Sequence, residues 1–116
     1  MIARPRLAWS EHGLPCLAWR NDLGAWCGYV GVPPAHPIHR RSYHELDHID
    51  AHGGLTFSGS LPDKRADWWV GFDCAHAGDY VPALSQVGGE VRSLDYVRAE
   101  VGRLAAQVAA VTDVDA

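Results

Sequence analysis

The stretch SLDYVRAEVGRLAAQVAAV, residues 93 to 111, decides the fold class of this chain. Its apolar residues recur at intervals of four and three, the period of an α-helix that buries one face. They are Val97, Val101, Leu104, Val108 and Val111. Ser93 is a good N-cap residue, and Asp95 in the first turn suits the positive end of the helix dipole. We therefore expect a long C-terminal helix whose apolar stripe is covered by a sheet, or alternatively by a second copy of the chain in a homodimer.

Four segments upstream of this helix have the alternating pattern of short strands. They are residues 15–22, 26–32, 55–59 and 67–73. The turn-forming residues Asn21 to Gly24 predict that the first two strands form a hairpin. The short connection between the last two favours their lying side by side. The fold class that we predict is α+β: a small, mainly antiparallel sheet with the long C-terminal helix packed on it.

The composition limits the classes of function. The 116 residues, 47% of them hydrophobic, are enough for a single domain over residues 1–116 with a core of its own. A net charge of −4 argues against a nucleic acid polymer as a partner, although a compact anion needs only a few local donors. No long apolar run predicts a membrane span or a signal peptide. Three cysteines without a C-x-x-C pair indicate reduced thiols and a cytoplasmic protein, and no cofactor is required.

A zinc-peptidase motif is the most conspicuous local pattern. HELDH, residues 44–48, matches H-E-x-x-H, in which a helix places two histidines on one face. We expect a short helix over about Tyr43 to Ile49, because Ser42 and Glu45 have the spacing of a capping box. His44 and His48 would then bind the metal, with His52 as third ligand. The alternative is a solvated turn, and the short helix and the glycines that follow favour it. A divalent metal thus stays a secondary possibility.

Two glycine-framed segments place polar groups at the ends of predicted strands. They are HGGLTFSG, residues 52–59, and GFDCAHAGD, residues 71–79. Gly53 and Gly54 can present successive N–H groups as an anion-binding nest, or they are ordinary turn residues. An aspartate that orients a histidine is the usual arrangement for proton transfer or for hydrogen-bonded recognition.

These segments predict one ligand pocket. If the last two strands are neighbours, polar residues of both segments meet on one face, where Trp69 is either a stacking platform or part of the core. Tyr29 and His36 would close the pocket from the segment of residues 28–37, which includes the second half of the second strand. The candidate ligand-binding residues are Tyr29, His36, His52, Gly53, Gly54, Thr56, Trp69, Asp73, His76 and Asp79.

Four segments resemble a family of small uncharacterised proteins of bacteriophages and prophages. They are GYVGVPPAHP (28–37), HGGLTFSG (52–59), WWVGFDCAHAGDYVP (68–82) and SLDYVRAEVGRLAAQV (93–108). The likeness extends from about Trp26 to Val108. It fixes no activity, but it implies an accessory protein in the host cytoplasm, of a kind that often counters host immunity, sometimes by sequestering nucleotide-derived signals.

Three hypotheses about function follow. The first is a binding protein for a small polar ligand that carries phosphate or ribose, such as a nucleotide-derived immune signal. The second is a hydrolase or nucleotide-cleaving enzyme, with His52, Asp73 and His76 as acid and base groups, with or without a divalent metal. The third is a protein-interaction module that blocks a host factor through an aromatic surface.

Overall fold

The computed structural model describes residues 6–21, 24–61, 67–74, 79 and 92–112. Five strands form one antiparallel sheet in the order β1-β2-β3-β5-β4. They are β1 (Arg6–Glu11), β2 (Leu14–Arg20), β3 (Trp26–Val32), β4 (Phe57–Gly59) and β5 (Trp68–Asp73). One short 3-10 helix, η1 (Tyr43–Glu45), and one α-helix, α1 (Leu94–Ala110), complete the regular structure of the described residues. The predicted α+β class is confirmed.

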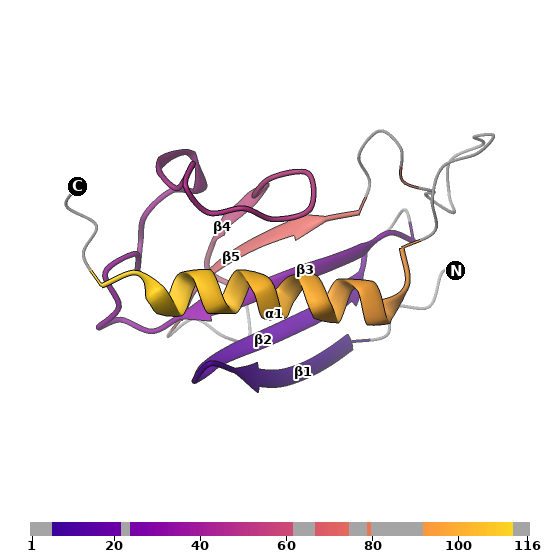
Figure 1. Ribbon diagram of the computed structural model, residues 1–116, viewed down its shortest axis with the longest axis horizontal. Coiled ribbons are helices and arrows are strands. Elements are labelled where there is room, and N and C mark those ends of the chain that lie inside the picture. Colours follow the sequence, from indigo (N-terminus) through magenta and orange to yellow (C-terminus); the bar gives the residue numbers. More distant parts are fainter. Residues whose placement is uncertain (1–5, 22–23, 62–66, 75–78, 80–91, 113–116) are drawn as a thin grey trace.

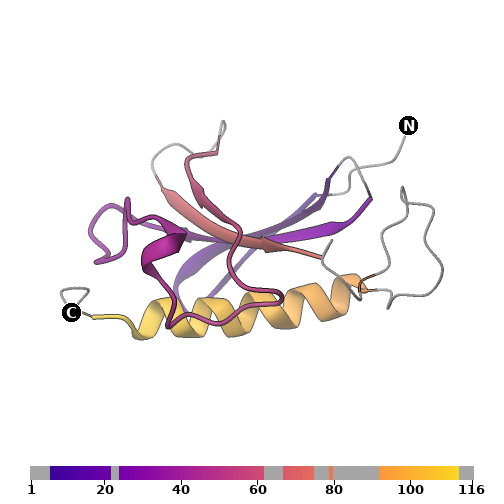
Figure 2. The same cartoon turned by 90° about the horizontal axis from the view of Figure 1, so that it is seen from above.

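Helix α1 lies lengthwise across one face of the sheet, over β1, β2 and β3 (Figure 1). The connection that follows β3 runs along the same side of the sheet and adds Ile38, Leu46 and Ile49 to the core beneath the helix (Figure 2). The predicted apolar stripe of α1 is buried there, because Val97, Val101, Leu104 and Val108 are fully covered within the chain. The stripe is therefore occupied by the chain's own sheet and does not form a dimer seam.

The face opposite α1 has its own apolar cluster. Leu17, Leu61 and Trp69 are buried there, and Trp19, Tyr29 and Phe57 pack around them. This division follows the predicted alternation of β5, in which Val70 and Phe72 face the helix side and Trp69 faces away. The hairpin of β2 and β3 and the pairing of β4 with β5 are also as the sequence predicts.

Two predictions about secondary structure differ from the structure. The first strand, β1, has no counterpart in the sequence analysis. It pairs with β2 through a two-residue turn in which His12 and Gly13 both have positive φ, 54° and 76°. A histidine at such a position is not one of the usual turn signals, which explains the omission.

No helix in the described part of the chain has the length and apolar character needed to cross a membrane.

The helix predicted over Tyr43–Ile49 is the second difference. Only the single 3-10 turn η1 forms, and it ends at Glu45. The Ser42 hydroxyl accepts from the His44 amide, and the Glu45 carboxylate binds Arg41 and also interacts with the Ser42 backbone amide. These cap contacts support one 3-10 turn and no α-helix. Separate turns follow, which allow Leu46 and Ile49 to reach the core.

The closest approach of helix and sheet requires a glycine at position 28. A Cβ atom on Gly28 would lie 2.5 Å from Cγ2 of Val101 and 2.7 Å from Cζ of Phe72. We predict that Gly28→Ala lowers the free energy of unfolding by about 1–3 kcal/mol through overpacking, as measured by urea denaturation. Val101→Ala in the same chain should recover part of that loss. Purely additive effects in the double-mutant cycle would contradict the proposed contact.

Candidate functional site

Asp79 is the charged residue that the described part of the fold buries, with 2% of its surface exposed. Within the described part of the chain, the side chains of Arg92 and His52 bind its carboxylate. Nε of Arg92 donates to Oδ1 at 2.7 Å, and Nε2 of His52 lies 2.8 Å from Oδ2 and 3.0 Å from Oδ1. A buried carboxylate is stable only when such partners offset its lost hydration. The site is therefore built around this one charge.

Tyr96 extends the chain of hydrogen bonds. Its hydroxyl lies 2.7 Å from Nδ1 of His52, and the guanidinium of Arg92 lies over its ring at 4.9 Å from the centroid. Burial raises the pKa of the Tyr96 hydroxyl above its ordinary value, so it is a neutral group at physiological pH. We call His52, Asp79, Arg92 and Tyr96 the polar cluster.

The imidazole of His52 is satisfied in either protonation state. If it is neutral, Nε2–H donates to Asp79 and Nδ1 accepts from the Tyr96 hydroxyl. If it is protonated, both nitrogens donate and the hydroxyl accepts. Hydrogen-bonded groups of this kind can recognise a polar ligand or transfer a proton.

The start of α1 positions two members of the polar cluster. Ser93 caps the helix by accepting from the Tyr96 amide at 3.1 Å, so Arg92 stands immediately before the cap. Arg92 and Tyr96 are four residues apart, and this spacing at a predicted helix start was the signal available in the sequence. Neither residue is among the site residues predicted above.

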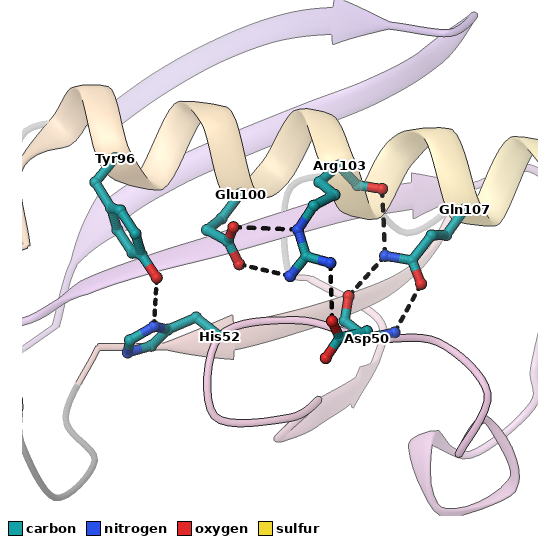
Figure 3. Close-up of polar contacts among 6 residues, drawn as sticks. All are labelled: Asp50, His52, Tyr96, Glu100, Arg103 and Gln107. Carbon is teal, nitrogen blue, oxygen red and sulfur yellow. Dashed lines mark hydrogen bonds and ion pairs between the residues drawn. The ribbon is translucent and has the colours of Figure 1, made fainter.

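His52 is positioned by a loop that is fastened to α1 (Figure 3). The side-chain amide of Gln107 makes two hydrogen bonds to the backbone of Asp50. Its Oε1 accepts from the Asp50 amide and its Nε2 donates to the Asp50 carbonyl, both at 2.7 Å. Arg103 binds the Asp50 carboxylate at 2.8 Å and is itself held by Glu100. The loop is thus fixed two residues before the imidazole.

These contacts come from a polar stripe on α1. Tyr96, Glu100, Arg103 and Gln107 recur at intervals of four, three and four, beside the apolar stripe and with the same period. One stripe packs on the sheet, and the other binds the loop that carries His52.

Residues of the predicted pocket lie on opposite sides of the sheet. His52 lies on the side of α1, whereas Asp73 alternates to the opposite face with Trp69. The Thr56 hydroxyl donates to Oδ2 of Asp73 at 3.3 Å, so these two residues do meet as predicted. The predicted meeting of His52 with Thr56 and Asp73 is wrong, because the sequence does not tell on which side of the sheet a loop returns.

The predicted aromatic platform belongs to the second core. Trp69 is fully buried, so its ring faces are not open to a ligand. Tyr29 stacks on Trp19 with ring centroids 4.3 Å apart and meets the ring of Phe57 edge-on at 5.5 Å. Burial raises the pKa of the Tyr29 hydroxyl above its ordinary value. These rings fill the face opposite α1 and lie apart from the polar cluster.

His36 lies at the other end of α1. Its Nδ1 accepts from the Ile38 amide at 3.1 Å, so Nε2–H is free to donate to the Val108 carbonyl at 2.9 Å. Val108 is twelve residues from Tyr96, about 18 Å along a helix. His36 therefore caps the C-terminal end of α1 and cannot close a pocket at the polar cluster.

Gly53, Gly54 and His76 are the remaining residues of the predicted site. Gly53 and Gly54 have positive φ, 68° and 87°, which favours glycine at both positions. The Gly54 amide donates to the Ala51 carbonyl at 2.8 Å, so it closes a turn and does not face an anion. His76 lies outside the described residues.

The geometry of a zinc peptidase is missing. His44 and His48 are exposed, and η1 ends before a second turn would align them on one helix face. His52, the third candidate ligand, is bound to Asp79 and Tyr96. Among the described residues, no three His, Cys, Asp or Glu side chains are grouped so as to hold a metal ion.

Comparison with known proteins identifies no relative. No family model matches the chain, and no curated protein or solved structure matches it either. The resemblance to phage proteins therefore stays a prediction.

The cysteines are unsuited to nucleophilic chemistry. Cys16, Cys27 and Cys74 are buried, and burial raises the pKa of the first two to about 11 and of Cys74 to about 12. We predict that at pH 8 an aromatic disulfide reagent labels the folded protein roughly a hundredfold more slowly than the urea-unfolded chain, because the thiolate is the reactive form. Labelling of even one thiol at the unfolded rate in the folded protein would contradict this prediction.

The Gln107 contact provides a test of how the loop is fixed. Gln107→Ala removes both bonds to Asp50, so we predict faster hydrogen exchange of the Asp50 amide and a loss of about 1–2 kcal/mol in the free energy of unfolding. Gln107→Glu can still accept from that amide but cannot donate to the carbonyl, and the amide should keep partial protection. The β3 amides serve as an internal control. Unchanged exchange at Asp50 in Gln107→Ala would exclude this docking contact.

Proposed function

We propose that the protein binds a small polar ligand with an anionic group at the polar cluster, and that this ligand is nucleotide-derived, with phosphate or ribose. The observation that carries the proposal is the buried Asp79 carboxylate, on which His52 and Arg92 converge. Burying a charge costs several kcal/mol that its partners must offset, and apolar residues of similar volume would often stabilise a fold as well or better.

The donors of the polar cluster suit an anionic group. The side chains of His52 and Arg92 are 11% and 20% exposed, so both reach solvent while Asp79 does not. A guanidinium matches the oxygens of a phosphate, and Arg92 stands beside the N-terminus of α1, where the helix dipole is positive. The neutral Tyr96 hydroxyl adds a group that can bond a ribose or phosphate oxygen. These local donors suffice for a compact anion in a chain of net charge −4.

The biological setting of the proposal rests on the resemblance to phage proteins. In that setting the protein is cytoplasmic and sequesters a nucleotide-derived immune signal without altering it. This part of the proposal depends on the sequence resemblance and not on the chemistry of the polar cluster.

The test is isothermal titration of the purified protein with nucleotides and cyclic nucleotides. We predict saturable binding and recovery of the intact ligand after denaturation. His52→Ala should weaken binding roughly tenfold to a hundredfold, the equivalent of one hydrogen bond to a charged group. His44→Ala, which removes an exposed histidine of η1, is the matched control and should bind as the wild type does. The absence of binding across the nucleotide panel would refute the proposal.

One observation favours an enzyme as the second candidate. The hydrogen-bonded series Tyr96–His52–Asp79 is an arrangement that can transfer a proton. The same titration separates the two, because an enzyme returns products instead of the intact ligand. A protein-interaction module would ignore the nucleotides and co-purify with a host polypeptide.

A further inference from the structure

The surroundings of Asp79 are those of a bound anion. Two donors from different parts of the chain, Nε of Arg92 and Nε2 of His52, contact the same carboxylate within 3.0 Å. Contacts of this length and charge are what a phosphate or carboxylate ligand receives from a protein. In this structure the chain supplies that anion itself.

The two donors are held in place independently of Asp79. His52 is bound by the Tyr96 hydroxyl and carried by the loop that Gln107 fastens to α1. Arg92 adjoins the Ser93 cap, and its guanidinium lies over the Tyr96 ring. The donors should therefore keep their positions when the carboxylate is removed.

An external anion and Asp79 compete for the same donors. Two negative groups that share one small, largely buried site repel each other strongly, so simultaneous occupancy is unfavourable. The apparent affinity for an anion is then lowered by the free energy needed to displace the carboxylate. Such competition favours ligands that make further contacts over a bare anion.

We propose that His52 and Arg92 form an anion cradle that Asp79 fills, and that a phosphate group of the ligand binds by taking the place of the Asp79 carboxylate. This inference rests on the function proposed above and names its mode of binding. It makes Asp79 an internal competitor whose removal strengthens anion binding, whereas a residue that contacts the ligand would weaken binding when removed.

The test is titration with inorganic phosphate. Asp79→Ala should bind phosphate at least roughly tenfold more tightly than the wild type, and Asp79→Asn should lie between them because a neutral amide competes less well. Adding His52→Ala to Asp79→Ala should abolish the gain. Glu45→Gln is the matched control, because it neutralises an exposed carboxylate that also binds an arginine, and it should bind phosphate as the wild type does.

Equal or weaker phosphate binding by Asp79→Ala overturns the proposal. If that variant fails to fold, Asp79→Asn decides on the same criterion. A measurement on the unaltered protein decides independently of any variant: the carboxyl carbon signal of Asp79 in NMR should shift on saturation with phosphate, and binding without a shift overturns the proposal.

The two proposals can fail separately. If nucleotides bind the wild type while Asp79→Ala gains no affinity for phosphate, the cradle is refuted and the binding function stands. If Asp79→Ala gains affinity for phosphate while no nucleotide binds the wild type, the anion cradle of His52 and Arg92 is supported and the proposed function is refuted.

Discussion

The burial of one helix stripe against the sheet is the contact on which the rest of the structure depends. Val101 of α1 approaches β3 so closely that only a glycine fits at position 28. Three valines and one leucine of the helix are fully covered there, together with Ala105, and each of these four larger side chains contributes about 1.5–3 kcal/mol by leaving water. Because this contact sets the position of α1, the polar stripe from Tyr96 to Gln107 faces the loop that follows Ile49.

Both stripes use one helical period for different purposes. The apolar stripe fixes the helix on β1, β2 and β3, and the polar stripe binds the Asp50 backbone and His52. The loop has little regular structure of its own, and hydrogen bonds to α1 hold it together with its own turns and the burial of Ile49 and Ala51. The polar cluster follows from this geometry, because His52 arrives beside the first turn of the helix, where Arg92 and Tyr96 stand.

The sequence predicts the sheet and the helix well because periodicity reports burial. The strands β2, β3 and β5, their faces and the N-cap of α1 all follow from local patterns. The sequence predicts two residues of the polar cluster, His52 and Asp79, and does not predict Arg92 and Tyr96. Alternation assigns side chains to faces of a strand, yet it does not say which face a connecting loop covers. The sequence therefore places His52 and Asp73 together, although the sheet separates them.

The location of the polar cluster at a helix start has a thermodynamic consequence. Terminal turns open more readily than the middle of a helix, and the cluster draws Tyr96 from the first turn of α1 and Arg92 from the position before its cap. A molecule bridging Arg92 and His52 would restrain that turn in the way an additional cap does. Occupancy and helix order are then coupled reciprocally: whatever firms the turn raises affinity, and whatever binds suppresses fraying by the same free energy.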